Sequence, residues 1–329
     1  MRLSKWVMPL IVLCALYVFW SQNQSPPESG LDRTTQEDRD TKPVLRQKTV
    51  EVDPVPPEAT PSKDIHLPSK PYAKEIRPVG PQIPIKTESQ STKSGNPYLL
   101  PTDSIPFRIE GNWAIAYGDV LLGTVTAPKG VTTGNHRPEK PRLWDSAIIP
   151  YGIHADLQGK ERVEAAIRYF NENTVVRFVP IEGPEEDAVV FVPDERNCAS
   201  YIGRIGGMQP IMVADKCGTQ ELIHELMHAL GFVHEHSRVD RDRYLEVVWD
   251  NIQADYWPQF AMVPDILIHE YRGRVFDFDA SSAMLYPPTA FAKEKGLTTL
   301  KSKPGSQLNP ATEGLSKVDR ERLFYLYGS

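Results

Sequence analysis

The sequence lacks the basic stripes that mark nucleic-acid-binding proteins. Its 37 Lys and Arg residues are outnumbered by 43 Asp and Glu residues, for a formal net charge of −6. Nowhere do basic and aromatic residues interleave in the manner of a nucleic-acid-binding motif. We therefore expect no nucleic-acid partner. With 329 residues, 40% of them hydrophobic, the chain can bury one sizeable core.

The sequence also has no apolar run as long as a comfortable membrane-spanning helix. The run from Trp6 to Trp20 has fifteen residues, whereas a helix needs ~20 to span a membrane comfortably. Because Arg2 and Lys5 precede it, we interpret residues 1–20 as a targeting segment that places the rest of the chain outside the cytoplasm. No small-residue cleavage site follows, which favours an uncleaved signal anchor over a cleaved signal peptide. The protein is then extracytoplasmic, either membrane-anchored through this segment or secreted.

Residues 21–100 are poor in aromatic residues and rich in proline. They contain thirteen of the thirty prolines but only two aromatic residues, Tyr72 and Tyr98, and no helical or alternating hydrophobic period persists. Such a segment cannot bury enough apolar surface to offset the entropy of ordering it. The composition predicts a disordered Pro-rich linker, either a tether for an anchored enzyme or a spacer without function.

The most informative stretch runs from His224 to His234 and reads HELMHALGFVH. On a helix, residues four apart share a face, so His224 and His228 can present two imidazoles to one point. Gly231 can end the helix in a left-handed conformation and bring His234 back as a third ligand. Three imidazoles with an open fourth position are typical of a catalytic Zn²⁺ site. The alternative to a metal site is a helix that carries two unrelated surface histidines. The presence of Gly231 and His234 argues against that alternative.

This pattern predicts a zinc peptidase with one Zn²⁺ per catalytic domain. Zinc lowers the pKa of its bound water from ~15.7 towards ~7 and polarises the scissile carbonyl. Glu225 would act as the general base, taking the proton of the attacking water and passing it to the leaving amine. A third histidine ligand also selects the metzincin pattern, which includes a downstream Met-turn. Met284 lies fifty residues beyond His234 and would form an apolar floor beneath the ligands.

The segment from His224 to Asp242, HELMHALGFVHEHSRVDRD, resembles the extended zinc signature of the astacin family. Ser282 to Tyr286, SAMLY, resembles the family's Met-turn, with Leu285 where histidine is usual. Residues 144–151, 198–217 and 323–329 are similar to further family segments, so the resemblance covers residues 136–329. It implies that Tyr286 is a mobile zinc ligand that stabilises the oxyanion. It also implies that the mature amino terminus folds inward to Glu235.

Residues 101–135 are interpreted as a propeptide-like segment. Alternating apolar residues predict short strands around a turn at Gly118-Asp119. The turn can be an ordinary hairpin. Alternatively, it resembles the family's F-x-G-D motif, here Ala116 to Asp119 without the Phe, whose aspartate binds zinc in the latent enzyme. A carboxylate at the open zinc position would displace the catalytic water. Processing is then expected within residues 127–143.

Three cysteines allow only one disulfide. Cys14 lies in the apolar run and is interpreted as a plain apolar residue. Cys198 and Cys217 form an even pair outside the cytoplasm and are expected to be bridged, although two separate buried thiols are an alternative. Their spacing resembles the family's central disulfide. The family's second bridge is missing at both expected positions, Val175 and Ser329, which indicates a domain stabilised there by packing.

The expected fold class is α+β, with a metzincin-like catalytic domain over residues 136–329. Strands are predicted over 147–151, 175–179, 188–192 and 210–213, and helices over 160–171, 219–230 and 317–327. We expect a monomer that cleaves protein or peptide substrates, with the substrate added antiparallel to an edge strand. The alternative is a surface-anchored binding protein on the same scaffold whose catalysis is incidental.

Overall fold

The computed structural model describes residues 72–73, 80–83, 98, 103–126, 129–181, 187–268, 270–271 and 274–328. All of them belong to one compact unit, Thr60–Ser329. The expected targeting segment, residues 1–20, lies outside the described residues, as does most of the expected linker over 21–100. Within the described part of the chain, no helix has the length and apolar character needed to cross a membrane.

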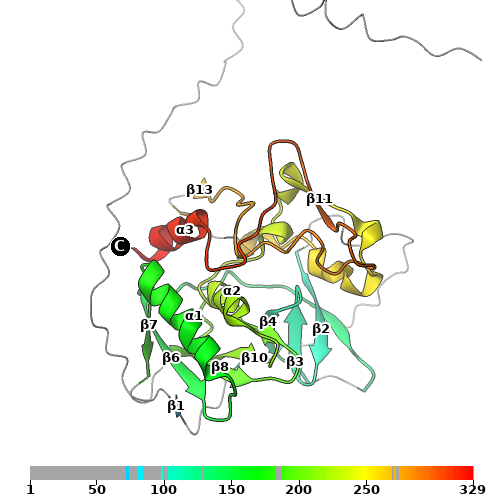
Figure 1. The fold of residues 1–329 in the computed structure, drawn as a ribbon. Coiled ribbons are helices and arrows are strands. Elements are labelled where there is room, and N and C mark those ends of the chain that lie inside the picture. Colours follow the sequence, from blue (N-terminus) through cyan, green and yellow to red (C-terminus); the bar gives the residue numbers. More distant parts are fainter. Residues whose placement is uncertain are drawn as a thin grey trace, which may run out of the picture. The chain divides into compact units, whose positions relative to one another are not determined.

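The main sheet of the described residues has six strands (Figure 1). Strands β6 (Ile148–His154), β8 (Asp187–Pro193) and β10 (Gly207–Val213) are parallel neighbours. Strands β7 (Arg177–Pro180) and β1 (Tyr72–Ala73) also pair with β6, and β9 (Cys198–Ala199) pairs antiparallel with β10. The central strand β8 carries a continuous apolar run, residues 188–191, which is fully buried. Such a run is typical of a strand covered on both faces.

Helices α1 (Lys160–Asn173) and α2 (Thr219–Ala229) pack against each other over this sheet (Figure 1). The apolar residues of α1 recur at helical spacing as Val163, Ile167 and Phe170, and all three are buried. Phe170 also makes an edge-to-face contact with Phe178 of β7, with the ring centroids 5.4 Å apart. The stripe therefore fixes α1 against the sheet on which α2 also rests.

The turn that leads into α2 is held from two sides. Cys198 and Cys217 form a disulfide with a Cα–Cα distance of 5.8 Å, which ties β9 to the start of the helix. From α1, Nη1 of Arg162 donates hydrogen bonds to three backbone carbonyls of the same turn, at Ala214, Asp215 and Cys217. The beginning of α2 is thus fixed before its first histidine is reached.

A second, antiparallel sheet is formed by the segment expected to be propeptide-like. Its strand order is β4 (Val120–Thr124), β3 (Trp113–Ala116), β2 (Ile105–Glu110) and β5 (Thr133–His136). Apolar residues of this sheet share one buried cluster with Ala261, Val263 and Leu267 of the C-terminal half. Gln82 bridges to Thr124, and Ile83 is buried in the same cluster. Tyr72–Ala73 also pair with β6. These short segments are therefore structured, although they lie in the stretch 21–100 that is predicted to be disordered.

The C-terminal half consists mostly of turns, as the weak periodicity of its sequence indicates. It contains short 3-10 helices and two small antiparallel pairs before helix α3 (Lys317–Tyr327). The pairs are β11 (Leu245–Val247) with β14 (Leu300–Ser302), and β12 (Glu270–Tyr271) with β13 (Arg274–Val275). The 3-10 helices are Glu235–Ser237, Arg241–Arg243, Trp249–Asn251, Ala254–Phe260 and Asp265–Leu267.

The strands and helices predicted for the catalytic domain are present, with ends that shift by a few residues. Strand β10 begins earlier than expected, at Gly207, and β6 continues to His154 because Ile153 is also buried in the sheet. In α3 the core contacts come from Leu323, Leu326 and Tyr327. Val318, in the first turn of the same helix, is only half-buried.

Phe170→Ala is expected to lower the free energy of unfolding by about 3–5 kcal/mol, because it leaves a large cavity in the core between α1 and β7. Phe324→Ala is the matched control, since that ring is 43% exposed, and it should cost less than about 1 kcal/mol. Denaturant titration of both variants at one fixed zinc concentration measures the difference. Equal losses would contradict the assignment of Phe170 to the core.

Candidate metal and catalytic site

Helix α2 aims two imidazoles in the same direction. Nδ1 of His224 donates to the backbone oxygen of Ala283 at 2.8 Å, and Nδ1 of His228 donates to that of Phe232 at 2.7 Å. When Nδ1 of a neutral imidazole carries the proton, Nε2 holds a free lone pair. Both rings therefore present acceptor nitrogens to the same point, which is how metal-binding histidines are usually oriented.

Gly231 brings the third imidazole to that point. Its φ of 105° lies in the left-handed region, where glycine ends a helix without steric cost. The N–H groups of Gly231 and Phe232 cap the last turn by bonding to the backbone oxygens of His228 and Met227. The chain then reverses, and Nε2 of His234 lies 3.0 Å from Nε2 of His224 and 3.3 Å from Nε2 of His228.

The carboxylate of Asp119 closes the fourth side of this group. Its oxygens lie 3.5 Å from Nε2 of His224, 3.5 Å from Nε2 of His228 and 3.2 Å from Nε2 of His234. Burial raises the pKa of this carboxyl, but the facing imidazoles outweigh burial and hold the pKa well below its usual value. The structure thus brings together all four residues that the sequence suggested as ligands, from segments more than a hundred residues apart.

The donor set fits a zinc ion. The ligand atoms of Asp119 and the three histidines all lie within 4.8 Å of one another. For Zn–N bonds of about 2.0–2.1 Å in a tetrahedral site, the nitrogens must be roughly 3.3 Å apart, close to the two spacings observed. Oδ1 of Asp119 is buried without a hydrogen-bond partner in the described part of the chain. A cluster of buried acceptors is costly unless a cation compensates it.

Glu225 follows the first ligand on α2 and is almost completely buried. Its Oε2 has no hydrogen-bond partner among the described residues. Burial, together with the charges of Asp119 and Glu221, raises the pKa of Glu225 well above its usual value. An unpartnered carboxylate oxygen beside the metal ligands is free to accept a proton from a water molecule in the same place.

Tyr286 stands on the other side of the ligands. Its ring packs against those of His234 and His236, with centroids 4.8 Å and 3.9 Å away, and these two imidazoles are themselves 5.0 Å apart. Its hydroxyl donates to the backbone oxygen of Tyr117 at 2.6 Å. His236 is fully buried in this stack. The hydroxyl of Tyr286 is thus engaged by the residue two positions before Asp119.

Residues 119–121 occupy the free edge of the main sheet. The N–H of Ser200 donates to the backbone oxygen of Asp119, and the N–H of Leu121 donates to the backbone oxygen of Ser200. This pairing continues beyond β9 in the parallel sense. The side chains of Ile115 and Leu121 complete an apolar cluster with Ala199, Tyr201 and Met212. The edge on which we expect a substrate to add is therefore covered by the chain itself.

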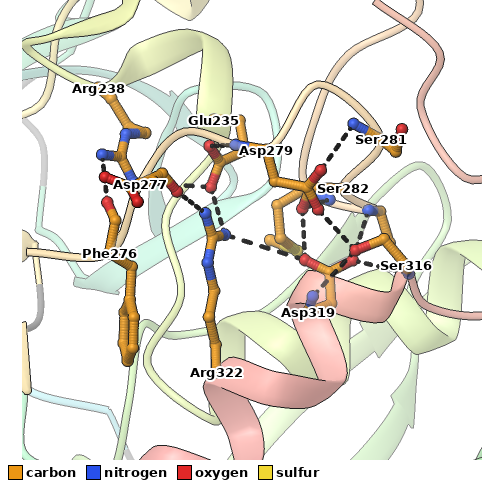
Figure 2. A network of polar contacts seen from close by, with 12 residues as sticks. Glu235, Arg238, Phe276, Asp277, Asp279, Ser281, Ser282, Ser316, Asp319 and Arg322 are labelled. Atoms are coloured by element: carbon orange, nitrogen blue, oxygen red, sulfur yellow. Dashed lines mark hydrogen bonds and ion pairs between the residues drawn. The ribbon is translucent and has the colours of Figure 1, made fainter. Parts of the chain in front are cut away.

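The Met-turn is anchored by helix α3, which the sequence did not indicate. Asp319 accepts hydrogen bonds from the hydroxyl of Ser282 at 2.6 Å and from the backbone N–H of Ala283 at 2.8 Å (Figure 2). It also forms the N-terminal capping box of α3 with Ser316. Met284 itself is fully buried in the main core. The backbone oxygen of Ala283 also accepts a hydrogen bond from Nδ1 of His224. Asp319 is therefore connected to this predicted metal ligand through the backbone of Ala283.

Glu235 is engaged by other parts of the chain (Figure 2). Its Oε1 accepts from Nη1 of Arg322 at 2.6 Å, and its Oε2 accepts from the N–H of Asp279 at 2.9 Å. Nη1 of Arg238 lies 3.9 Å away, and Arg238 is held in turn by a two-pronged bond to Asp240. Glu235 is thus the centre of a buried ion-pair network, to which a mature amino terminus would be an additional partner.

His228→Ala is expected to abolish stoichiometric zinc binding, because it removes one of the three neutral imidazole ligands and leaves only two. Affinity should fall by more than the 10–100-fold that follows from loss of an outer-shell partner. Atomic absorption after dialysis against a weak zinc buffer measures bound metal per chain. His154→Ala, on β6 and away from the cluster, is the control and should keep one zinc. Full zinc content in the His228 variant would contradict this ligand assignment.

Comparison with known proteins gives consistent results. Residues 136–328 match the Astacin peptidase family. The chain is 39% identical over 153 residues to zinc metalloproteinase nas-13 of Caenorhabditis elegans, covering 46% of this chain and 33% of that protein. It is 35% identical over 190 residues to zinc metalloproteinase nas-15 of the same organism, covering 57% of this chain and 32% of that protein.

A solved structure is also similar. It is the high choriolytic enzyme 1 of the medaka fish Oryzias latipes, a hatching enzyme zinc-protease. The two sequences are 31% identical, the match covers 57% of this chain and 94% of that chain, and the TM-score is 0.49. The chain spans about a third of the length of the two nematode relatives. The family match itself extends over more than half of the sequence, including every histidine of the cluster. The chain therefore belongs to the astacin family of peptidases.

Proposed function

We propose that this protein is a zinc-dependent endopeptidase that is made as a latent zymogen. The observation that carries the proposal is the convergence of three imidazoles and the Asp119 carboxylate on one buried point. His224, His228 and His234 would hold the zinc, and Asp119 would occupy the position that a catalytic site keeps open. Substrates are proteins or peptides, in keeping with the family.

The residues around the metal have separate roles in the proposed reaction. A bound Zn²⁺ supplies Lewis acidity, which acidifies a water molecule and polarises the scissile carbonyl. Glu225 takes the proton from the attacking water and delivers it to the leaving amine. The hydroxyl of Tyr286 donates a hydrogen bond to the oxygen on which negative charge develops. This interaction matters most in the transition state. The substrate backbone adds to the edge formed by residues 198–201.

Latency follows from the position of residues 117–121. Asp119 fills the site needed by water, and the hydroxyl of Tyr286 is bonded to Tyr117. The same segment covers the substrate edge at Ser200. One segment therefore blocks the water, the oxyanion donor and the substrate site together. Cleavage within residues 127–143 would separate this segment from the catalytic domain.

We further propose the domain organisation and location that the sequence predicts. Residues 1–20 are a signal anchor or signal peptide, 21–100 a linker, 101–135 the propeptide-like segment and 136–329 the peptidase domain. The protein is extracytoplasmic, either membrane-anchored through its N-terminal segment or secreted, and acts as a monomer. After processing, the new amino terminus is a partner for Glu235, next to Arg322 and Arg238.

Glu225→Gln is expected to lower kcat by about 10²–10⁴-fold, because the amide cannot accept the water proton. The assay is cleavage of casein or gelatin by the full chain after limited proteolysis, with zinc content measured in parallel. Glu246→Gln, on an exposed strand position, is the control and should retain activity. If the Glu225 variant and a zinc-chelated sample both remain active, the peptidase proposal fails, and a binding protein on this scaffold becomes the better explanation.

Asp119→Ala is expected to raise the activity of the uncleaved chain by about tenfold or more, because removing this ligand opens the fourth zinc position. Activity is measured on intact protein, and amino-terminal sequencing shows that no processing has occurred. Asp103→Ala, an exposed aspartate just before the same sheet, serves as the control. Unchanged latency in the Asp119 variant would show that the cover over Tyr286 and Ser200 is sufficient for latency, and would refute the carboxylate as its determinant.

A further inference from the structure

Gln259 lies at the active site but has no place in the mechanism above. It is near the end of the 3-10 helix Ala254–Phe260, and the residue is only 8% exposed. Its backbone is fixed on both sides. Its carbonyl oxygen accepts from Nε2 of His236 at 3.2 Å, and the next residue, Phe260, is fully buried. The side chain therefore projects from a rigid position.

The amide of Gln259 is aimed at the segment that blocks the site. A methyl group built on Gly118 would lie 3.1 Å from Oε1 of Gln259 and 2.8 Å from the hydroxyl of Tyr286. Oε1 and this hydroxyl thus face the same side of the Cα atom of Gly118, one residue before Asp119. The hydroxyl has a partner there, the carbonyl of Tyr117. Oε1, although buried, has no hydrogen-bond partner among the described residues.

A buried carbonyl oxygen without a partner is costly, and native proteins keep few of them. Oε1 of Gln259 contributes no described hydrogen bond to the fold or to the covering segment, so its polarity is unexplained in the latent state. In the processed enzyme a substrate strand takes the place of residues 117–119. Every residue of that strand except proline carries a backbone N–H, the donor that Oε1 lacks.

We propose that Gln259 is a substrate-binding residue, whose Oε1 accepts a hydrogen bond from a substrate backbone N–H next to the cleaved bond, beside the hydroxyl of Tyr286. This inference rests on the proposed peptidase function. The short distances from Gly118 leave no room for a bulky side chain between Gln259 and Tyr286, so the group recognised is the main chain. Gln259 would therefore hold the substrate in register without selecting a particular amino acid.

The test compares Gln259→Leu with wild type, both processed from the full chain. Leucine keeps the size of the side chain and removes the acceptor. With a peptide substrate, kcat/KM should fall about tenfold, the value of one hydrogen bond made on binding. The melting temperature should not fall, because leucine removes a buried acceptor that has no hydrogen-bond partner among the described residues. The zinc content per chain should stay the same, because Gln259 is not one of the residues proposed to hold the metal. Gln253→Leu, an exposed residue just before the same 3-10 helix, is the matched control.

A set of ester-containing substrates identifies the partner. Each has one backbone N–H near the cleaved bond replaced by oxygen. At one position the replacement should cost wild type about tenfold in kcat/KM and cost the Gln259 variant nothing further, which is the coupling that a double-mutant cycle detects. An active wild type with no such coupling at any position would overturn this inference alone. A processed wild type that cleaves no peptide would overturn the proposed function and this inference with it.

Discussion

Two hydrogen bonds to backbone carbonyls determine the chemistry of the site. Ala283 and Phe232 accept the Nδ1 protons of His224 and His228, and so leave the Nε2 lone pairs directed at a common point. His234 and Asp119 add further acceptors there. Because acceptors cannot satisfy one another, a buried group of this kind needs a cation at its centre. The fold's task is to hold the groups close in spite of their mutual repulsion.

Helix α3 contributes to that task from the end of the chain. Asp319 binds Ser282 and Ala283, so the same residue that caps α3 also holds the carbonyl acceptor of His224. Arg322, one turn later, neutralises Glu235. The hydroxyl of Tyr327 donates to the backbone oxygen of Leu230 at the end of α2. These contacts hold α3 against the Met-turn, Glu235 and the end of α2.

The parts of the site that could be predicted from the sequence depend on local geometry. His224 and His228 share a helix face by their spacing, and Gly231 marks the end of that helix. The fold class and most strands followed from apolar runs. Asp319, Arg322 and Gln259 could not be found in this way. Their roles come from contacts with residues between 23 and 141 positions away, and no periodicity or spacing in the sequence connects such pairs.

The turn at residues 117–119 explains how a peptide segment can occupy a peptidase site without presenting a bond for cleavage. Tyr117 and Gly118 both have positive φ, 49° and 96°, and for tyrosine this conformation costs roughly 1–2 kcal/mol. Burial of the Tyr117 ring and the bond from Tyr286 to its carbonyl offset that cost. In the proposed zymogen the reversal directs a side-chain carboxylate, and not a backbone carbonyl, at the three imidazoles. In that proposed latent form, the strained turn is what distinguishes the bound segment from a substrate.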